Sequence, residues 1–154
     1  MKGPEHGKTA RGNLARTRPG AGESNWFSNF ALSDISRTKE TEFLGTPWDP
    51  RAREIMLKQS PFMNSGGVKA ATLFIHGEVD YRVPLEGAIQ LYTSLKKQGV
   101  PAKMIIYEGM PHGIRGHWNN VHRTMHELRW GETYLKPTGP VRISEERGER
   151  PDLR

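Results

Sequence analysis

Two residues suited to proton transfer follow two strand-like runs of this sequence. Asp80 lies in the segment TLFIHGEVDYRVP (72–84), shortly after an apolar and β-branched run. His112 lies 32 residues later in EGMPHGI (108–114), after a second run of the same kind. A carboxylate can hold an imidazole in one tautomer and stabilise its charged form while the imidazole moves protons. An acid followed by a histidine is the order in which the last two members of some Ser, Asp, His triads occur.

Each residue also has an ordinary alternative, since aspartates after strands often cap turns and histidines before glycines often lie on the surface. The surrounding elements favour a shared position. The sequence predicts a strand over 71–76, a helix over 85–98 and a strand over 103–107. This alternation is typical of two parallel strands with a right-handed crossover. Loops that leave the carboxyl ends of neighbouring parallel strands meet at one edge of the sheet, where we expect Asp80 and His112 to meet.

Other helices are predicted on either side of this unit. Asp49 is a plausible N-cap with a proline after it, which predicts a helix over 51–58. A last helix is predicted over about 118–135, with one apolar stripe made by Trp118, Val121, Met125 and Leu128. The segment SNWFSNF (24–30) is expected to close a strand or line a cavity, and 33–42 is expected to be a loop or a short helix.

Two histidines of the last helix have a spacing that metal sites use. His122 and His126 are four residues apart, so they share one helix face. No glutamate follows His122, which leaves the metalloprotease motif incomplete. We therefore expect solvent-facing histidines and neither a metal nor another cofactor.

Composition places the folded part in the middle of the chain. Hydrophobic residues make up 34% of the 154 residues, and both ends are nearly free of large apolar side chains. The sequence predicts a disordered basic tail over 1–20, one folded unit over 21–137 and a disordered charged tail over 138–154. The first tail carries a net +4 of the total +6, so no basic face for nucleic acid is expected on the folded unit.

The chain contains no cysteine, which excludes disulfides and thiol catalysis. Residues 1–20 lack the apolar core of a signal peptide, and no run is long enough to span a membrane. These features predict a cytoplasmic protein without a membrane contact.

Several motifs together resemble the catalytic domain of the prolyl oligopeptidase family of serine peptidases. These are HGEVDYRVP (76–84), QLYTSLKKQGVP (90–101) and IIYEGMPHGI (105–114), preceded by SNWFSNF (24–30), EFLGTPWD (42–49) and SPFMN (60–64). The resemblance is strongest to the dipeptidyl-peptidase and acylaminoacyl-peptidase branch. It implies that Asp80 is the acid and His112 the base of a catalytic triad.

The sequence departs from that family at the nucleophile. The family carries its serine in a G-x-S-x-G-G turn upstream of the matching segments, and no G-x-S-x-G occurs in this chain. Ser24 and Ser28 stand in the wrong context to replace it. The prediction is a fragment, a truncated gene product or a mis-assigned start, inactive alone.

The predicted fold class is α/β. We expect a partial α/β-hydrolase fold with a parallel sheet and flanking helices, without the N-terminal strands and the nucleophile turn. The first interpretation is the C-terminal segment of a serine-type peptidase that acts on peptides once its catalytic domain is completed. The alternatives are a catalytically inactive interaction module of hydrolase descent and an esterase-type hydrolase. An unpaired strand edge also predicts self-association.

Overall fold

The computed structural model of the protein has a two-stranded parallel sheet at its centre. Strand β1 (Thr72–Gly77) pairs with strand β2 (Ala102–Tyr107), and helix α4 (Leu85–Lys97) connects them. The register places Gly77, the last residue of β1, opposite Tyr107, the last residue of β2. The predicted strand–helix–strand unit is therefore confirmed, and the loops after both strands leave from the same edge of the sheet.

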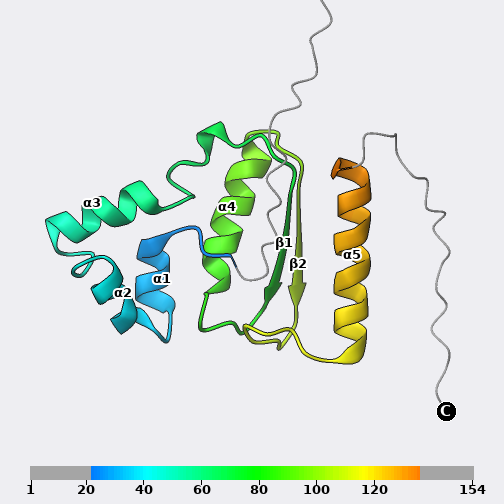
Figure 1. Ribbon diagram of the computed structural model, residues 1–154, viewed down its shortest axis with the longest axis horizontal. Helices are drawn as coiled ribbons and strands as arrows, with labels where there is room; N and C mark the ends of the chain where they lie inside the picture. Colours follow the sequence, from blue (N-terminus) through cyan, green and yellow to red (C-terminus); the bar gives the residue numbers. More distant parts are fainter. Residues whose placement is uncertain (1–21, 136–154) are drawn as a thin grey trace, which may run out of the picture.

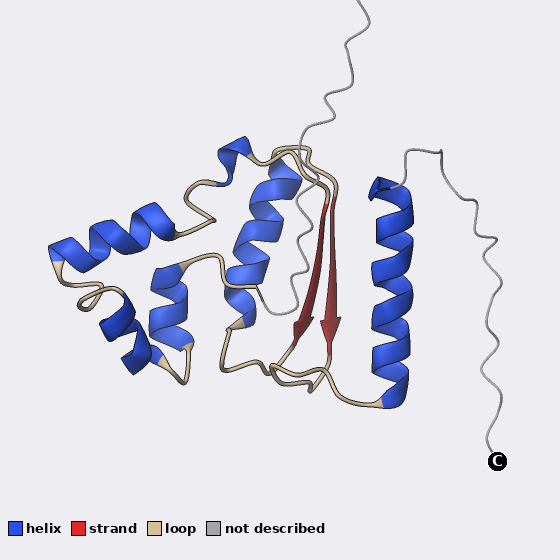
Figure 2. Ribbon diagram, viewed as in Figure 1, coloured by secondary structure: helices blue, strands red, loops and turns tan. Residues whose placement is uncertain are grey.

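Helices cover both faces of this sheet (Figures 1 and 2). Helix α4 packs on one face through a buried cluster of Phe74, Ala88, Leu95 and Val100. Helix α5 (His117–Leu135) lies along the other face, where Trp130 packs against Leu73, Ile75 and Tyr107. Every residue of β1 is buried between the two layers. That position explains its continuous apolar run, because a strand covered on both faces has no solvent side.

Three short helices form a lobe beside α4, comprising α1 (Trp26–Leu32), α2 (Ser36–Glu42) and α3 (Pro50–Gln59) (Figure 1). Asp49 caps α3 as predicted, since its Oδ1 accepts the backbone N–H of Arg51 at 2.8 Å. The lobe has its own small core of Phe43, Ala52 and Met56. A single 3-10 turn (Ser65–Gly67) connects the lobe to β1.

The prediction for SNWFSNF (24–30) was wrong, because this segment begins helix α1 instead of closing a strand or lining a cavity. The side chain of Asn25 accepts the N–H of Phe27 and caps the helix. Trp26, Phe27 and Phe30 then pack together against the core of the lobe. Residues 33–42 contain the short helix α2, which was one of the two alternatives expected for them.

The apolar stripe of α5 faces away from the sheet, which its periodicity could not indicate. Trp118 is 77% exposed and Leu128 is 63% exposed. His122 is exposed as expected, but its ring bonds to Tyr107 of β2, and the ring of His126 bonds to Lys103. The side of α5 that meets the sheet thus combines these histidines with Trp130, which packs on the apolar residues of the sheet.

The structure describes residues 22–135, so the two predicted tails, 1–20 and 138–154, lie outside the described residues. Within 22–135, no helix is both long and apolar enough to cross a membrane.

Candidate active site

Asp80 is held in one orientation by the loop that follows β1. Its side chain is fully buried. One carboxylate oxygen, Oδ1, accepts the backbone N–H groups of Arg82 at 3.0 Å and Val83 at 2.9 Å. Such a local turn fixes the carboxylate without help from distant residues. The other oxygen, Oδ2, is left to face His112.

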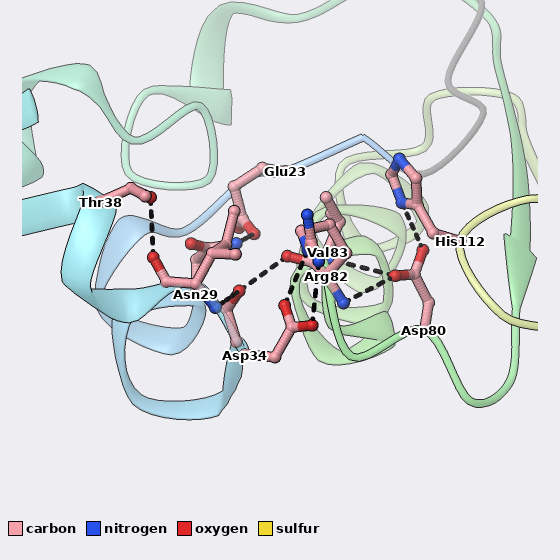
Figure 3. Close-up of polar contacts among 10 residues, drawn as sticks. Glu23, Asn29, Asp34, Thr38, Asp80, Arg82, Val83 and His112 are labelled. Atoms are coloured by element: carbon pink, nitrogen blue, oxygen red, sulfur yellow. Dashed lines mark hydrogen bonds and ion pairs between the residues drawn. The ribbon is translucent and has the colours of Figure 1, made fainter.

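His112 lies in the loop after β2 and contacts Asp80 through its Nδ1. The distance from Nδ1 to Oδ2 of Asp80 is 3.0 Å, and the imidazole is the donor because an ionised carboxylate only accepts. The His112 side chain is 53% exposed. Figure 3 shows its second nitrogen pointing away from Asp80. The imidazole therefore has one nitrogen fixed by a buried acid and the other open to an incoming group.

Gly77 allows the His112 loop to lie across the end of β1. A Cβ atom on Gly77 would overlap the backbone carbonyls of Met110 and Pro111. The N–H of Val79 donates to the carbonyl of Met110 at 3.1 Å, which ties the two loops together at this crossing. The glycine of the HG pair thus sets how closely the acid and the histidine approach.

His76 lies behind Asp80 and braces the same loop. Its ring is 1% exposed, and its Nε2 lies 2.7 Å from the carbonyl oxygen of Val83. Since a carbonyl only accepts, this nitrogen carries a proton. The same nitrogen is 3.5 Å from Oδ2 of Asp80. His76 therefore packs behind the site and donates a hydrogen bond there.

Contacts from residues 33–34 of the helical lobe, here called the latch, hold the outer side of the loop that carries Asp80, here called the acid loop (Figure 3). Arg82 forms a two-pronged pair with Asp34, with Nε–Oδ1 and Nη2–Oδ2 distances of 2.8 and 3.2 Å. The Ser33 hydroxyl donates to the Arg82 carbonyl at 2.8 Å, and the Asp34 N–H donates to the Tyr81 carbonyl at 2.8 Å. The hydrogen bond to Asp34 raises the pKa of Arg82, so this cation stays charged. Sequence reasoning missed Ser33 and Asp34 because nothing local marks residues that bond 48 positions away.

An open pocket of about 360 Å³ is formed by the Asp34–Arg82 pair, His112 and their neighbours. It is lined by Asp34, Val79, Tyr81, Arg82, Pro111 and His112. His112 is thus the member of the Asp80–His112 pair that faces this pocket.

The two serines weighed as substitutes for the nucleophile are engaged elsewhere. Ser24 is 1% exposed, and its hydroxyl donates to the carbonyl of Gly87 in α4. The Ser28 hydroxyl accepts from the side chain of Gln90 at 3.0 Å. Over residues 22–135, no serine hydroxyl is hydrogen-bonded to His112. The arrangement can orient an imidazole and move protons through it, and it resembles the acid–base part of a triad without its nucleophile.

Comparison with known proteins places this arrangement in a family. The sequence model of the prolyl oligopeptidase family matches residues 18–138. An uncharacterized peptidase of Bacillus subtilis is 31% identical over 59% of this chain and 14% of its own length. A probable dipeptidyl-peptidase 5 of Aspergillus niger is 26% identical over 87% of this chain and 18% of its own length.

Solved structures give the same result for the fold. The acylaminoacyl peptidase of Pyrococcus horikoshii matches with a TM-score of 0.69 and 31% identity, over 82% of this chain and 21% of that one. An acylaminoacyl peptidase in complex with Z-Gly-Gly-Phe-chloromethyl ketone matches with a TM-score of 0.68 and 31% identity, over 79% of this chain and 20% of that one. The chain spans about a fifth or less of the length of these proteins, and its fold is part of an α/β-hydrolase fold. It belongs to the prolyl oligopeptidase family and forms part of a serine-peptidase domain.

Proposed function

We propose that this chain supplies the acid and the general base of a serine-peptidase active site. Asp80 orients the imidazole, and His112 takes the proton of a serine hydroxyl and then gives it to the leaving amine. The observation that carries the proposal is the 3.0 Å contact between Nδ1 of His112 and the fully buried Oδ2 of Asp80.

The surroundings of the pair suit these roles. Because Asp80 accepts two backbone N–H bonds, its carboxylate stays in place when the imidazole gains a proton. The charge that develops on the ring then faces a fixed negative partner. His112 lines the 360 Å³ pocket, where a peptide bond and a serine would meet.

The nucleophile and the oxyanion hole are proposed to come from polypeptide other than the sequence described. The 154 residues contain no G-x-S-x-G turn, and the two serines considered as substitutes point to other partners. In hydrolases of this type, the backbone N–H after the nucleophile also forms part of the oxyanion hole. By itself the chain is therefore expected to be inactive, and a peptide is its expected substrate when the domain is completed.

A chimera tests this proposal. The segment of the Pyrococcus horikoshii acylaminoacyl peptidase that this chain matches would be replaced by residues 22–135, leaving the enzyme's upstream part to provide the nucleophile. We expect the chimera to hydrolyse an acylated peptide and to react with a fluorophosphonate probe. His112→Ala should lower kcat by about 10⁴-fold or more, and Asp80→Asn by a similar factor. The 154-residue chain alone serves as the control and should take up no probe.

Three outcomes would contradict the proposal. The first is a chimera that elutes and melts as a folded protein but hydrolyses nothing. The second is a His112→Ala chimera that keeps its activity. The third is fluorophosphonate labelling of the isolated chain, since this requires a nucleophile of its own. Hydrolysis of esters without hydrolysis of peptides would favour the esterase alternative.

A further inference from the structure

A second group of imidazoles lies on α5 and takes no part in the proposed active site. His122 and His126 occupy neighbouring turns of the helix, and their Nε2 atoms are 3.1 Å apart. The two rings are inclined at 72° to each other. Their outer nitrogens contact β2, where Nδ1 of His122 is 2.9 Å from the Tyr107 hydroxyl and Nδ1 of His126 is 3.3 Å from Nζ of Lys103.

The hydrogen-bond partners fix where the protons lie in this chain of four side chains. The Lys103 ammonium only donates, so Nδ1 of His126 accepts and the proton of that ring is on Nε2. This Nε2–H donates to Nε2 of His122, whose own proton is then on Nδ1 and faces the Tyr107 oxygen. Both imidazoles are neutral in this arrangement, and one proton lies between their two Nε2 atoms.

We propose that His122 and His126 form a two-histidine site for a borderline divalent cation, Cu²⁺ or Ni²⁺, with water as the remaining ligands. Histidines four residues apart on a helix are a recurring pair of metal ligands. Bonds of about 2.1 Å from a metal to two nitrogens 3.1 Å apart enclose an angle of about 95°. That angle is close to the one between neighbouring ligands of a tetragonal site, which Cu²⁺ and Ni²⁺ prefer, and narrower than a tetrahedral site requires.

Tyr107 provides the outer contact that metal-binding histidines usually have. A ligating histidine commonly donates its second N–H to an oxygen, which fixes the tautomer and the ring orientation. His122 already does so with the Tyr107 hydroxyl, and it keeps the same tautomer when Nε2 binds a metal.

Lys103 opposes binding of the metal ion, so removal of its charge tests the proposal. A metal on Nε2 of His126 moves the ring proton to Nδ1, which then meets a donor instead of an acceptor. The ammonium also repels a divalent cation. Replacing Lys103 by an uncharged residue of similar length should therefore strengthen binding.

The experiment is a titration of the full, untagged chain with Ni²⁺ or Cu²⁺ at neutral pH, in competition with a chromophoric chelator. We expect one metal ion at this site, and affinity lower by about tenfold or more in His122→Ala and in His126→Ala. His117→Ala is the matched control, since His117 is an exposed histidine of the same helix, and it should not change the affinity. Lys103→Met should tighten binding a few-fold.

Nuclear magnetic resonance spectra of the six histidine rings give a second readout that does not depend on a variant's folding. Substoichiometric Cu²⁺ should broaden the signals of His122 and His126 before the others. Equal broadening of the exposed His112 and His117 rings would overturn the proposal. So would equal loss of affinity in all three alanine variants, because both results describe unspecific binding to surface histidines.

Discussion

At the scale of single residues, the candidate site depends on the two carboxylate oxygens of Asp80, which have different hydrogen-bond partners. Oδ1 of Asp80 is committed to two backbone N–H groups, and Oδ2 is 3.0 Å from the imidazole of His112. Because these backbone hydrogen bonds come from the next three residues of the chain, they orient the carboxylate without help from the distant histidine. The site therefore requires a side chain at position 80 that accepts hydrogen bonds through both oxygens, in addition to its negative charge.

Asp80→Asn should reverse the tautomer of His112. The backbone N–H groups of Arg82 and Val83 require an acceptor, so the amide oxygen would take the place of Oδ1 and the amide NH₂ would face the imidazole. Nδ1 of His112 must then accept, which places the ring proton on Nε2. Long-range nitrogen–proton correlation spectra of the histidine rings distinguish the two tautomers. A neutral His112 ring that kept its proton on Nδ1 in the variant would show that Asp80 does not set the tautomer.

At the scale of elements, the site is formed where two strand ends and a helical lobe converge. The parallel register brings Gly77 and Tyr107 together, and both loops depart from that point. Gly77 has no side chain, so the loop that carries His112 can lie directly on the strand end. From the other side, the Asp34–Arg82 pair joins the lobe to the acid loop. This exposed pair contributes little stability by itself, since such pairs typically contribute up to about 1 kcal/mol.

Gly77→Ala should separate the two loops. The added methyl group overlaps the carbonyls of Met110 and Pro111, and backbone cannot move aside as a flexible side chain does. We expect a loss of about 1–3 kcal/mol in the free energy of unfolding, measured by urea denaturation, and changed chemical shifts for His112. Gly66→Ala is the matched control, because nothing lies within 4 Å of its added Cβ, and it should stay within about 0.5 kcal/mol. Equal effects of both substitutions would contradict the close crossing.

At the scale of the whole molecule, the described part of the chain exposes surface that proteins usually cover. Within the described residues, strand β2 has a partner on one edge only, and its Ile106 is 45% exposed. Helix α5 exposes an apolar stripe that includes Trp118, Met125 and Leu128. Unpaired strand edges and apolar patches of this kind promote association.

We propose that the isolated chain self-associates in solution. Sedimentation velocity should show an average mass that rises with protein concentration above that of one 17.4 kDa chain. Leu128→Glu should reduce association by placing a charge in the stripe. Leu57→Glu is the matched control, because Leu57 is an exposed leucine of α3, away from the stripe. A single species of monomer mass at all concentrations would contradict the proposal.

The sequence by itself determined the parts of this protein that local patterns encode. The two strand-like runs and the helix between them were enough to predict the parallel strand–helix–strand unit. From that unit followed the expectation that Asp80 and His112 meet at one edge of the sheet, and the structure brings them together. The motifs around both residues were also enough to indicate the family.

Only the tertiary structure decided what depends on contacts between distant segments. The Asp34–Arg82 pair and the close crossing at Gly77 both join residues from different elements. The rotation of α5 belongs here too, because Trp130, His122 and His126 face the sheet and the apolar stripe is left outside. The periodicity of apolar residues shows that a helix has an apolar and a polar side. The surface against which the helix packs determines which side is buried.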